Sequence, residues 1–139
     1  MNNNVGLWID HRKAVIVNLG EMGEVIREIP SHMEKHVRYS GGAEEDSGED
    51  QRYMRYAGHL HKYYQKVISH IRDAESILIL GPGEAKVELR TLLEHEALGG
   101  RIAGIETVDK MTDRQLAAKV RDHFEYSRAG HMADARNAT

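Results

Sequence analysis

The feature that most constrains the fold is a change of hydrophobic period near residue 52 of this 139-residue chain. Before this point, apolar residues alternate in short segments, as they do in half-buried strands. From residue 53 to residue 71, apolar residues recur every three to four positions, as on one face of an amphipathic helix. After residue 76, short and wholly apolar segments alternate with amphipathic ones, which is typical of strands buried between helices. The sequence therefore predicts an α/β domain.

The predicted elements follow one another closely, with a polar turn or a glycine pair between most of them. Thr112 and Gln115 have the spacing of a capping box and mark the start of the last helix. The order β-β-β-α-β-α-β-α predicts a mixed five-stranded sheet with helices on its faces, which is the arrangement of the ribonuclease H-like folds. The expected strands are residues 5–9, 14–19, 24–29, 76–80 and 101–108, and the expected helices are residues 52–71, 84–98 and 112–126.

The length predicts one domain, which we expect over residues 1–126. Residues 41–51 contain five carboxylates and no basic residue. Such a segment has little apolar surface to bury, so we expect a mobile acidic loop at about residues 38–51. Residues 127–139 show no hydrophobic period and are expected to form a flexible tail.

Composition excludes several classes of function. The sequence contains no cysteine, so disulfides, thiolate zinc sites and cysteine nucleophiles are absent. No apolar run approaches the length of a membrane span, and the first residues lack a secretory signal. We therefore expect a cytoplasmic protein without a membrane partner, and we expect neither a metal ion nor a cofactor.

The predicted helix from residue 52 carries basic residues on its polar side. Residues 52–72 contain no acid. A row of this kind predicts contacts with the phosphates of a polyanion, although a solvated helix face is the plainer interpretation. The candidate RNA-binding residues are Arg52, Arg55, His59, Lys62 and Lys66.

A second candidate site is the Gly81-Pro82-Gly83 turn between a predicted strand and a predicted helix. Backbone N–H groups at a helix start favour a phosphate or carboxylate, and Lys86 would add a positive charge. The candidate anion-binding residues are therefore Gly81, Gly83 and Lys86. The alternative is a rigid turn in which glycine allows close backbone packing.

Nuclease activity is not expected. Nucleases on this fold hold two divalent ions with a cluster of carboxylates. Asp10, at the end of the first strand, stands where one of these carboxylates would be, but the other positions carry no acid. We instead expect Asp10 to accept hydrogen bonds from the backbone of its own turn. Trp8 and the tyrosines of the helical stripe are expected in the core.

Three short motifs carry a resemblance to a known family. The segment Gln51-Arg52-Tyr53-Met54-Arg55-Tyr56, with Tyr63-Tyr64 farther on, resembles the helix after the GGQ loop in the middle domain of archaeal and eukaryotic peptide-chain release factors. The segment Ile77–Gly83 with Lys86 is similar to a strand-turn-helix of Pelota-type ribosome-rescue factors. The turn Asp10–Ala14 resembles a turn of the small bacterial relatives of these proteins. The resemblance covers roughly residues 5–125 and implies a ribonuclease H-like, translation-associated single domain.

The resemblance assigns Gln51 to the glutamine position of the GGQ motif. The two preceding residues are Glu49 and Asp50 instead of glycines. Carboxylates are repelled by ribosomal RNA, and they do not adopt glycine-only backbone conformations at low cost. We therefore favour a non-catalytic role.

Three functions remain open from the sequence. The first is a non-catalytic module that binds the ribosome or tRNA through the basic helix face, in ribosome rescue or stress. The second is a small-ligand phosphate-binding or hydrolase domain that uses the Gly-Pro-Gly turn. The third is a homodimeric interaction domain that pairs through an exposed sheet edge.

Overall fold

The computed structural model describes residues 3–20, 23–32 and 48–138, and within them the side chains of all residues except 48–53 and 126–138. In these residues, five strands and three α-helices follow one another in the predicted order β-β-β-α-β-α-β-α. Their bounds are β1 Asn4–Ile9, β2 Lys13–Gly20, β3 Gly23–Pro30, α2 Gly48–Ile71, β4 Ser76–Gly81, α3 Ala85–His95, the short 3₁₀ helix η1 Gly99–Arg101, β5 Ile102–Thr107 and α4 Asp113–Ala138.

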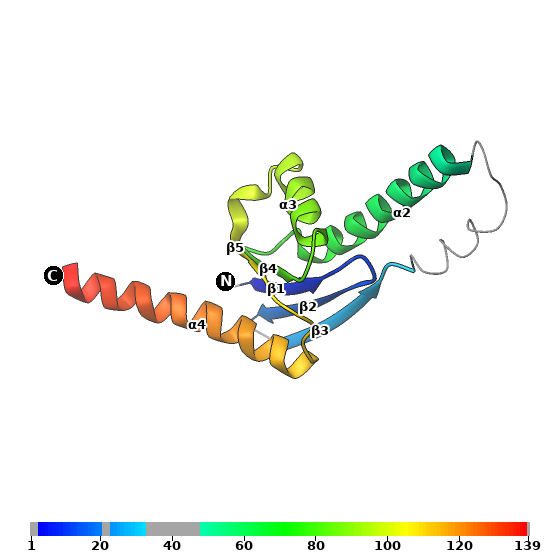
Figure 1. The fold of residues 1–139 in the computed structure, drawn as a ribbon. Coiled ribbons are helices and arrows are strands. Elements are labelled where there is room, and N and C mark those ends of the chain that lie inside the picture. Colours follow the sequence, from blue (N-terminus) through cyan, green and yellow to red (C-terminus); the bar gives the residue numbers. More distant parts are fainter. Residues whose placement is uncertain (1–2, 21–22, 33–47, 139) are drawn as a thin grey trace.

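The strands form one mixed sheet in the order β3-β2-β1-β4-β5. β1 pairs antiparallel with β2 and parallel with β4, and β5 continues the parallel side. Helices α2 and α3 cover one face of the sheet and α4 covers the other (Figure 1). This three-layer arrangement confirms the predicted ribonuclease H-like fold.

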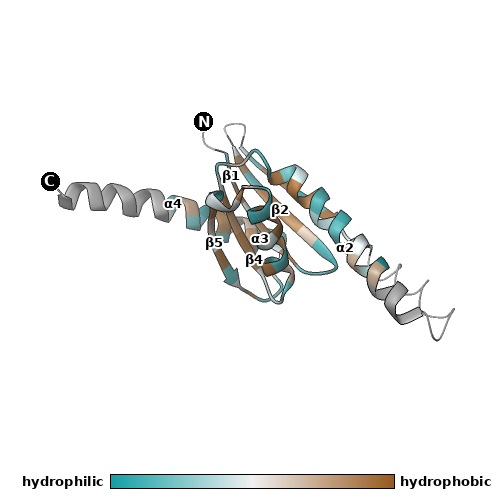
Figure 2. Cartoon of the chain, turned by 90° about the horizontal axis from the view of Figure 1, so that it is seen from above, coloured by the Kyte–Doolittle hydropathy of each residue, from teal (hydrophilic) through white to brown (hydrophobic). Residues whose placement is uncertain are grey.

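β1 is the central strand and is buried on both faces. Leu7 and Ile9 lie in the core below α2 and α3, together with Tyr63 and Tyr64 of α2. Trp8 points to the other face and packs against α4 residues such as Leu116. The strands are accordingly the most apolar part of the domain, while the helices alternate between apolar and polar residues (Figure 2). The prediction that Trp8 and the tyrosines at 63 and 64 belong to the core is confirmed.

Helix α4 approaches the sheet closely because β1 has no side chain at Gly6. A Cβ atom at Gly6 would lie 2.3 Å from Cγ2 of Val120. The helix begins with the predicted capping box, in which Gln115 N donates to Thr112 Oγ1 at 3.1 Å and Thr112 N donates to Gln115 Oε1 at 3.0 Å. These two bonds satisfy backbone donors that a helix start would otherwise leave open.

The start of α2 and the end of α3 differ from the prediction by several residues. α2 begins at Gly48, so residues 48–51 are helical and do not belong to the predicted loop; acidic residues such as Glu49 and Asp50 are favoured in the first turn of a helix. The rest of that loop, residues 38–47, lies outside the described residues. α3 ends at His95 instead of residue 98, because Ala97 adopts a left-handed backbone with φ of 62°.

The described part of the C-terminal segment, for which a flexible tail was expected over residues 127–139, has a helical backbone. α4 continues to Ala138, past the predicted end of regular structure at residue 126. Residues 127–138 contain four alanines and no proline. Alanine has the highest helix propensity, so a helix continues through this segment although it lacks a regular apolar stripe. No helix in the described part of the chain is both long and apolar enough to cross a membrane.

The junction between β1 and β4 yields a stability prediction. A Cβ atom at Gly81 would lie 2.3 Å from the carbonyl oxygen of Ile9, which is a backbone atom in the central strand. Gly81→Ala should therefore lower the free energy of unfolding by about 2 kcal/mol or more. Urea unfolding followed by circular dichroism measures this change.

Gly83→Ala is the matched control, since no heavy atom lies within 4 Å of a Cβ at that position. This variant should stay within about 0.5 kcal/mol of the parent protein. Equal losses for the two variants would contradict the close packing of β1 against β4.

Candidate functional site

The turn after β1 is held by the side chain of Asp10. Its Oδ1 atom accepts hydrogen bonds from Arg12 N at 2.8 Å and from Lys13 N at 2.9 Å. Asp10 N in turn donates to the carbonyl of Lys13 at 3.0 Å. The prediction that Asp10 bonds the backbone of its own turn is confirmed.

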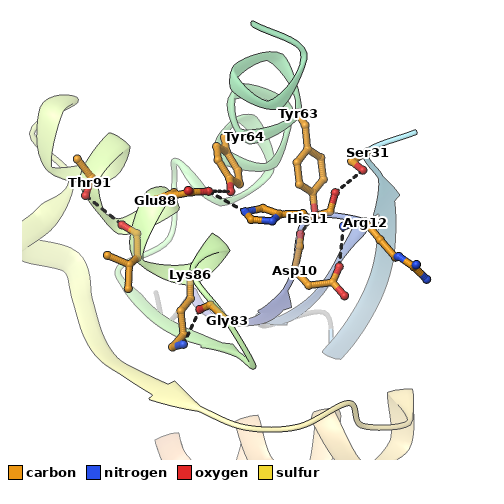
Figure 3. A network of polar contacts seen from close by, with 11 residues as sticks. Asp10, His11, Arg12, Ser31, Tyr63, Tyr64, Gly83, Lys86, Glu88 and Thr91 are labelled. Atoms are coloured by element: carbon orange, nitrogen blue, oxygen red, sulfur yellow. Dashed lines mark hydrogen bonds and ion pairs between the residues drawn. The ribbon is translucent and has the colours of Figure 1, made fainter. Parts of the chain in front are cut away.

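Two further elements fix this turn from outside. Ser31, at the end of β3, is buried and donates from Oγ to the carbonyl of His11 at 2.6 Å. Tyr63 of α2 donates from its hydroxyl to the carbonyl of Asp10 at 3.0 Å. Because β3 and α2 both hold the turn, the side chain of His11 projects from it in a defined direction (Figure 3).

His11 meets a carboxylate of α3 and a phenol of α2. Its Nε2 atom lies 2.9 Å from Oε1 of Glu88, and the hydroxyl of Tyr64 donates to the same oxygen at 2.5 Å. Since the carboxylate accepts, His11 carries its proton on Nε2 when it is neutral. Within the described part of the chain, Oε2 of Glu88 has no hydrogen-bond partner and is available as an acceptor (Figure 3).

Burial keeps the phenols of Tyr63 and Tyr64 protonated. It raises the pKa of Tyr63 well above its usual value of 10.0, and the nearby charge of Asp10 adds to the effect. The pKa of Tyr64 is also raised, first by burial and then by the hydrogen bond to Glu88. Both residues therefore act as hydrogen-bond donors and not as acid–base groups near neutral pH.

His11, Tyr64 and Glu88 lie at one end of a groove between α2 and α3. The groove has a volume of about 570 Å³. Its polar lining contains three histidines and two glutamates but no lysine or arginine. Among the described residues, no three His, Asp or Glu side chains are arranged as metal ligands. The lining residues are His11, Tyr56, Ala57, Leu60, His61, Tyr64, Glu84, Glu88, Thr91, Leu92 and His95.

The predicted RNA-binding residues divide into three groups. Arg55, Lys62 and Lys66 are exposed on α2. His59 is half-buried, and its Nε2 atom donates to the carbonyl of Ser31 at 2.6 Å, so it supports the end of β3. The backbone of Arg52 belongs to α2, but its side chain lies outside the described part; the same holds for Gln51, which was predicted as the GGQ-equivalent position and not as an RNA-binding residue.

The residues of the predicted anion site are bound to their own turn. Lys86 is buried, and its Nζ atom donates to the carbonyl of Gly83 at 2.6 Å. Gly81 packs against the carbonyl of Ile9. These contacts hold the turn rigidly, and they engage one of the three donors of the Lys86 ammonium.

The contact of His11 with Tyr64 and Glu88 does not follow from any pattern in the sequence. His11 lies 77 positions before Glu88 in the sequence, and Tyr64 lies 24 positions before it. No local motif links them, and Tyr64 was assigned only to the core. One weak signal was available: Glu84 and Glu88 are four residues apart and therefore share one face of α3.

Solved structures show what this fold resembles. Pelota from Archaeoglobus fulgidus matches with a TM-score of 0.58 and 15% identity over 98% of this chain and 36% of its own. Pelota from Thermoplasma acidophilum matches with a TM-score of 0.53 and 15% identity over 81% of this chain and 30% of its own. The archaeal translation termination factor aRF1 matches with a TM-score of 0.50 and 15% identity over 99% of this chain and 42% of its own.

These matches establish the fold. The chain spans between 30% and 42% of the length of the three proteins. The sequence matches no known family model, and no curated protein matches it either. A common three-layer architecture thus exists at an identity too low to transfer residue roles.

The buried phenols yield a pH prediction. The folded protein keeps Tyr63 and Tyr64 protonated, whereas the unfolded chain releases these protons near the usual value of 10.0. Stability is therefore fully present below about pH 10 and is lost as the pH rises further, by about 1.4 kcal/mol per pH unit for each phenol. Tyr64→Phe should reduce this alkaline slope, and urea unfolding at several pH values measures it.

Tyr56→Phe controls for the loss of a hydroxyl group from α2, because the hydroxyl of Tyr56 makes no hydrogen bond within the described part of the chain. At neutral pH, Tyr64→Phe should lower the free energy of unfolding by about 1 kcal/mol and Tyr56→Phe should change it little. An unchanged alkaline slope in Tyr64→Phe would show that this phenol is not buried in its protonated form.

Proposed function

We propose that this chain is a non-catalytic, translation-associated module that binds ribosomal RNA or tRNA through the basic row of α2, defined as Arg55, Lys62 and Lys66. The proposal includes a distant relationship to the middle domain of release factors and Pelota proteins, and a cytoplasmic location at the ribosome. A role in ribosome rescue or stress is consistent with these partners.

The proposal depends on the exposure of the basic row and on its lack of ion-pair partners in the described part of the chain. Lys62 follows Arg55 by seven residues and Lys66 follows Lys62 by four, so the three side chains lie along one side of the helix. All three are exposed. Within the described part of the chain, no hydrogen bond or ion pair engages them, in contrast to Arg72, which pairs with Glu96 at 2.7 Å. Unpaired cations in a row are suited to successive backbone phosphates.

The fold gives independent support. Two Pelota proteins and one archaeal translation termination factor have this architecture. The sequence motifs of α2 resemble the same proteins. Fold likeness alone does not assign a function, so the proposal depends on the basic row together with the motifs.

The acidic residues at the start of α2 support a non-catalytic role. Gln51, at the GGQ-equivalent position, lies within the helix and follows Glu49 and Asp50. The resemblance associates peptidyl-tRNA hydrolysis with a flexible glycine backbone before the glutamine. The two positions before Gln51 carry no glycine, and their backbone is helical. Binding without hydrolysis is the consistent function.

The other two functions have weaker support. An anion site at Gly83 would compete with the hydrogen bond from Lys86 to the Gly83 carbonyl. A homodimer would need a free sheet edge, and β3 carries Glu24, Arg27 and Glu28 and ends at Pro30, which disfavours edge pairing. We therefore propose neither the anion-binding function nor the homodimer.

Charge reversal tests the proposal. Lys62→Glu/Lys66→Glu should reduce the affinity for tRNA and for ribosomal RNA fragments by at least about tenfold, because two phosphate contacts become repulsive. The slope of log affinity against log salt should fall by about 0.7 to 0.9 for each lost contact. Fluorescence anisotropy at several salt concentrations gives both quantities, and adding Arg55→Glu should abolish binding.

The matched control is Lys110→Glu/Arg114→Glu, which makes the same change in net charge. Both residues are exposed. Arg114 lies in the first turn of α4, and Lys110 lies three residues before that helix. α4 covers the opposite face of the sheet from α2 (Figure 1). This control variant should bind RNA within about threefold of the parent protein. Equal losses of RNA affinity in both variants would show that net charge alone determines binding, and they would contradict the assignment of the RNA contacts to α2.

A further inference from the structure

The groove between α2 and α3 combines aromatic edges with hydrogen-bond acceptors. Tyr56, His61 and His95 line the groove; Tyr56 is half-buried, and the two histidines are exposed. Leu60 and Leu92 form apolar parts of the lining. A flat aromatic ligand fits such a surface, because its faces can stack on the rings while its edge meets the polar groups.

The polar groups on the α3 side are two carboxylates. Glu84, the N-cap residue of α3, and Glu88, in the first turn of the helix, lie four residues apart and both line the groove. Oε1 of Glu88 accepts from His11 and Tyr64, which fixes the carboxylate and leaves Oε2 as a free acceptor in the described part of the chain. Glu84 makes no side-chain cap at the start of α3. The groove therefore offers one carboxylate that two donors hold in place, Glu88, and a second, exposed carboxylate, Glu84. The lining residues that the structure describes include no lysine or arginine to neutralise them.

The groove lies beside the basic row. His61 lines the groove, and the next residue, Lys62, belongs to the row. Consecutive helical residues are about 100° apart, so a strand whose phosphates contact Lys62 passes over α2 close to the groove rim. An unpaired base of that strand has a path into the groove.

We infer that this groove binds an unpaired guanine base of the RNA that contacts the basic row. The inference rests on the proposed function and adds a sequence preference to it. Phosphate contacts position a strand without reading its sequence, whereas contacts to base edges specify it.

Guanine is selected by the pattern of donors on its Watson–Crick edge. It presents two adjacent donors, N1–H and the N2 amino group, to carboxylates that only accept. Adenine and cytosine present one amino donor beside a ring acceptor, and uracil presents one N–H between two carbonyl oxygens. In these three bases an acceptor faces a carboxylate, which is repulsive. The acceptors of Glu84 and Glu88 therefore favour guanine.

Mononucleotides test the groove without a long strand. Guanosine 5′-monophosphate should bind saturably, and it should shift the NMR signals of His61 and His95 because both residues line the groove. It should bind at least about tenfold more tightly than adenosine 5′-monophosphate, as expected for a double contact to a base edge. Inosine 5′-monophosphate lacks the N2 amino group and should lie between the two. Equal affinities for all three nucleotides, or no binding, would overturn the inference.

Variants separate recognition from stacking. Glu84→Gln should remove most of the guanine preference, while Glu94→Gln, on the same helix but outside the groove lining, should keep it. His61→Ala should weaken all nucleotides by a similar factor, because stacking does not distinguish bases strongly. Unchanged selectivity in Glu84→Gln and in Glu88→Gln would contradict recognition by these carboxylates.

Short oligonucleotides distinguish failure of this inference from failure of the proposed function. An oligouridine of about ten nucleotides and the same strand with one central guanine are compared by anisotropy. Salt-sensitive binding without a guanine preference would leave the basic row in place and overturn the guanine site. Selective binding of the mononucleotide without binding of either strand would support the groove and reject the basic row.

Discussion

The position of β1 between an antiparallel and a parallel neighbour is the constraint on which the rest of the structure depends. Its backbone bonds β2 on one side and β4 on the other, and its side chains contribute to both cores. The strand ends at Ile9, and the Asp10–Lys13 turn that follows is held by Ser31, directly after β3, and by Tyr63 of α2. The polar network of His11, Tyr64 and Glu88 exists because this turn is fixed at the edge of the packed core.

The sequence was sufficient for the architecture because the informative patterns are local. Alternation in β1 and β2, the apolar run of β4 and the capping box of Thr112 and Gln115 each depend on residues close in the chain. Boundaries were less accurate, since the left-handed conformation of Ala97 and the helical segment 127–138 do not follow from apolar periodicity.

The site was predictable only in part. The exposure of Arg55, Lys62 and Lys66 follows from their helical spacing opposite the buried tyrosines. The contact of His59 with the Ser31 carbonyl, the groove and its paired carboxylates depend on which helices the sheet brings together. Those relationships span tens of residues and have no signature in a single sequence. The charge pattern thus carries the proposal of a polyanionic ligand, while the packing of α2 against α3 carries the inference about a bound base.

Co-sedimentation with ribosomes at low and at high salt tests the central claim most directly. If the basic row of α2 binds ribosomal RNA, the full chain sediments with ribosomes at low salt and is released at high salt, and Lys62→Glu/Lys66→Glu stays in the supernatant under both conditions. Absence of association at low salt, for ribosomes and for total tRNA alike, would contradict a translation-associated function.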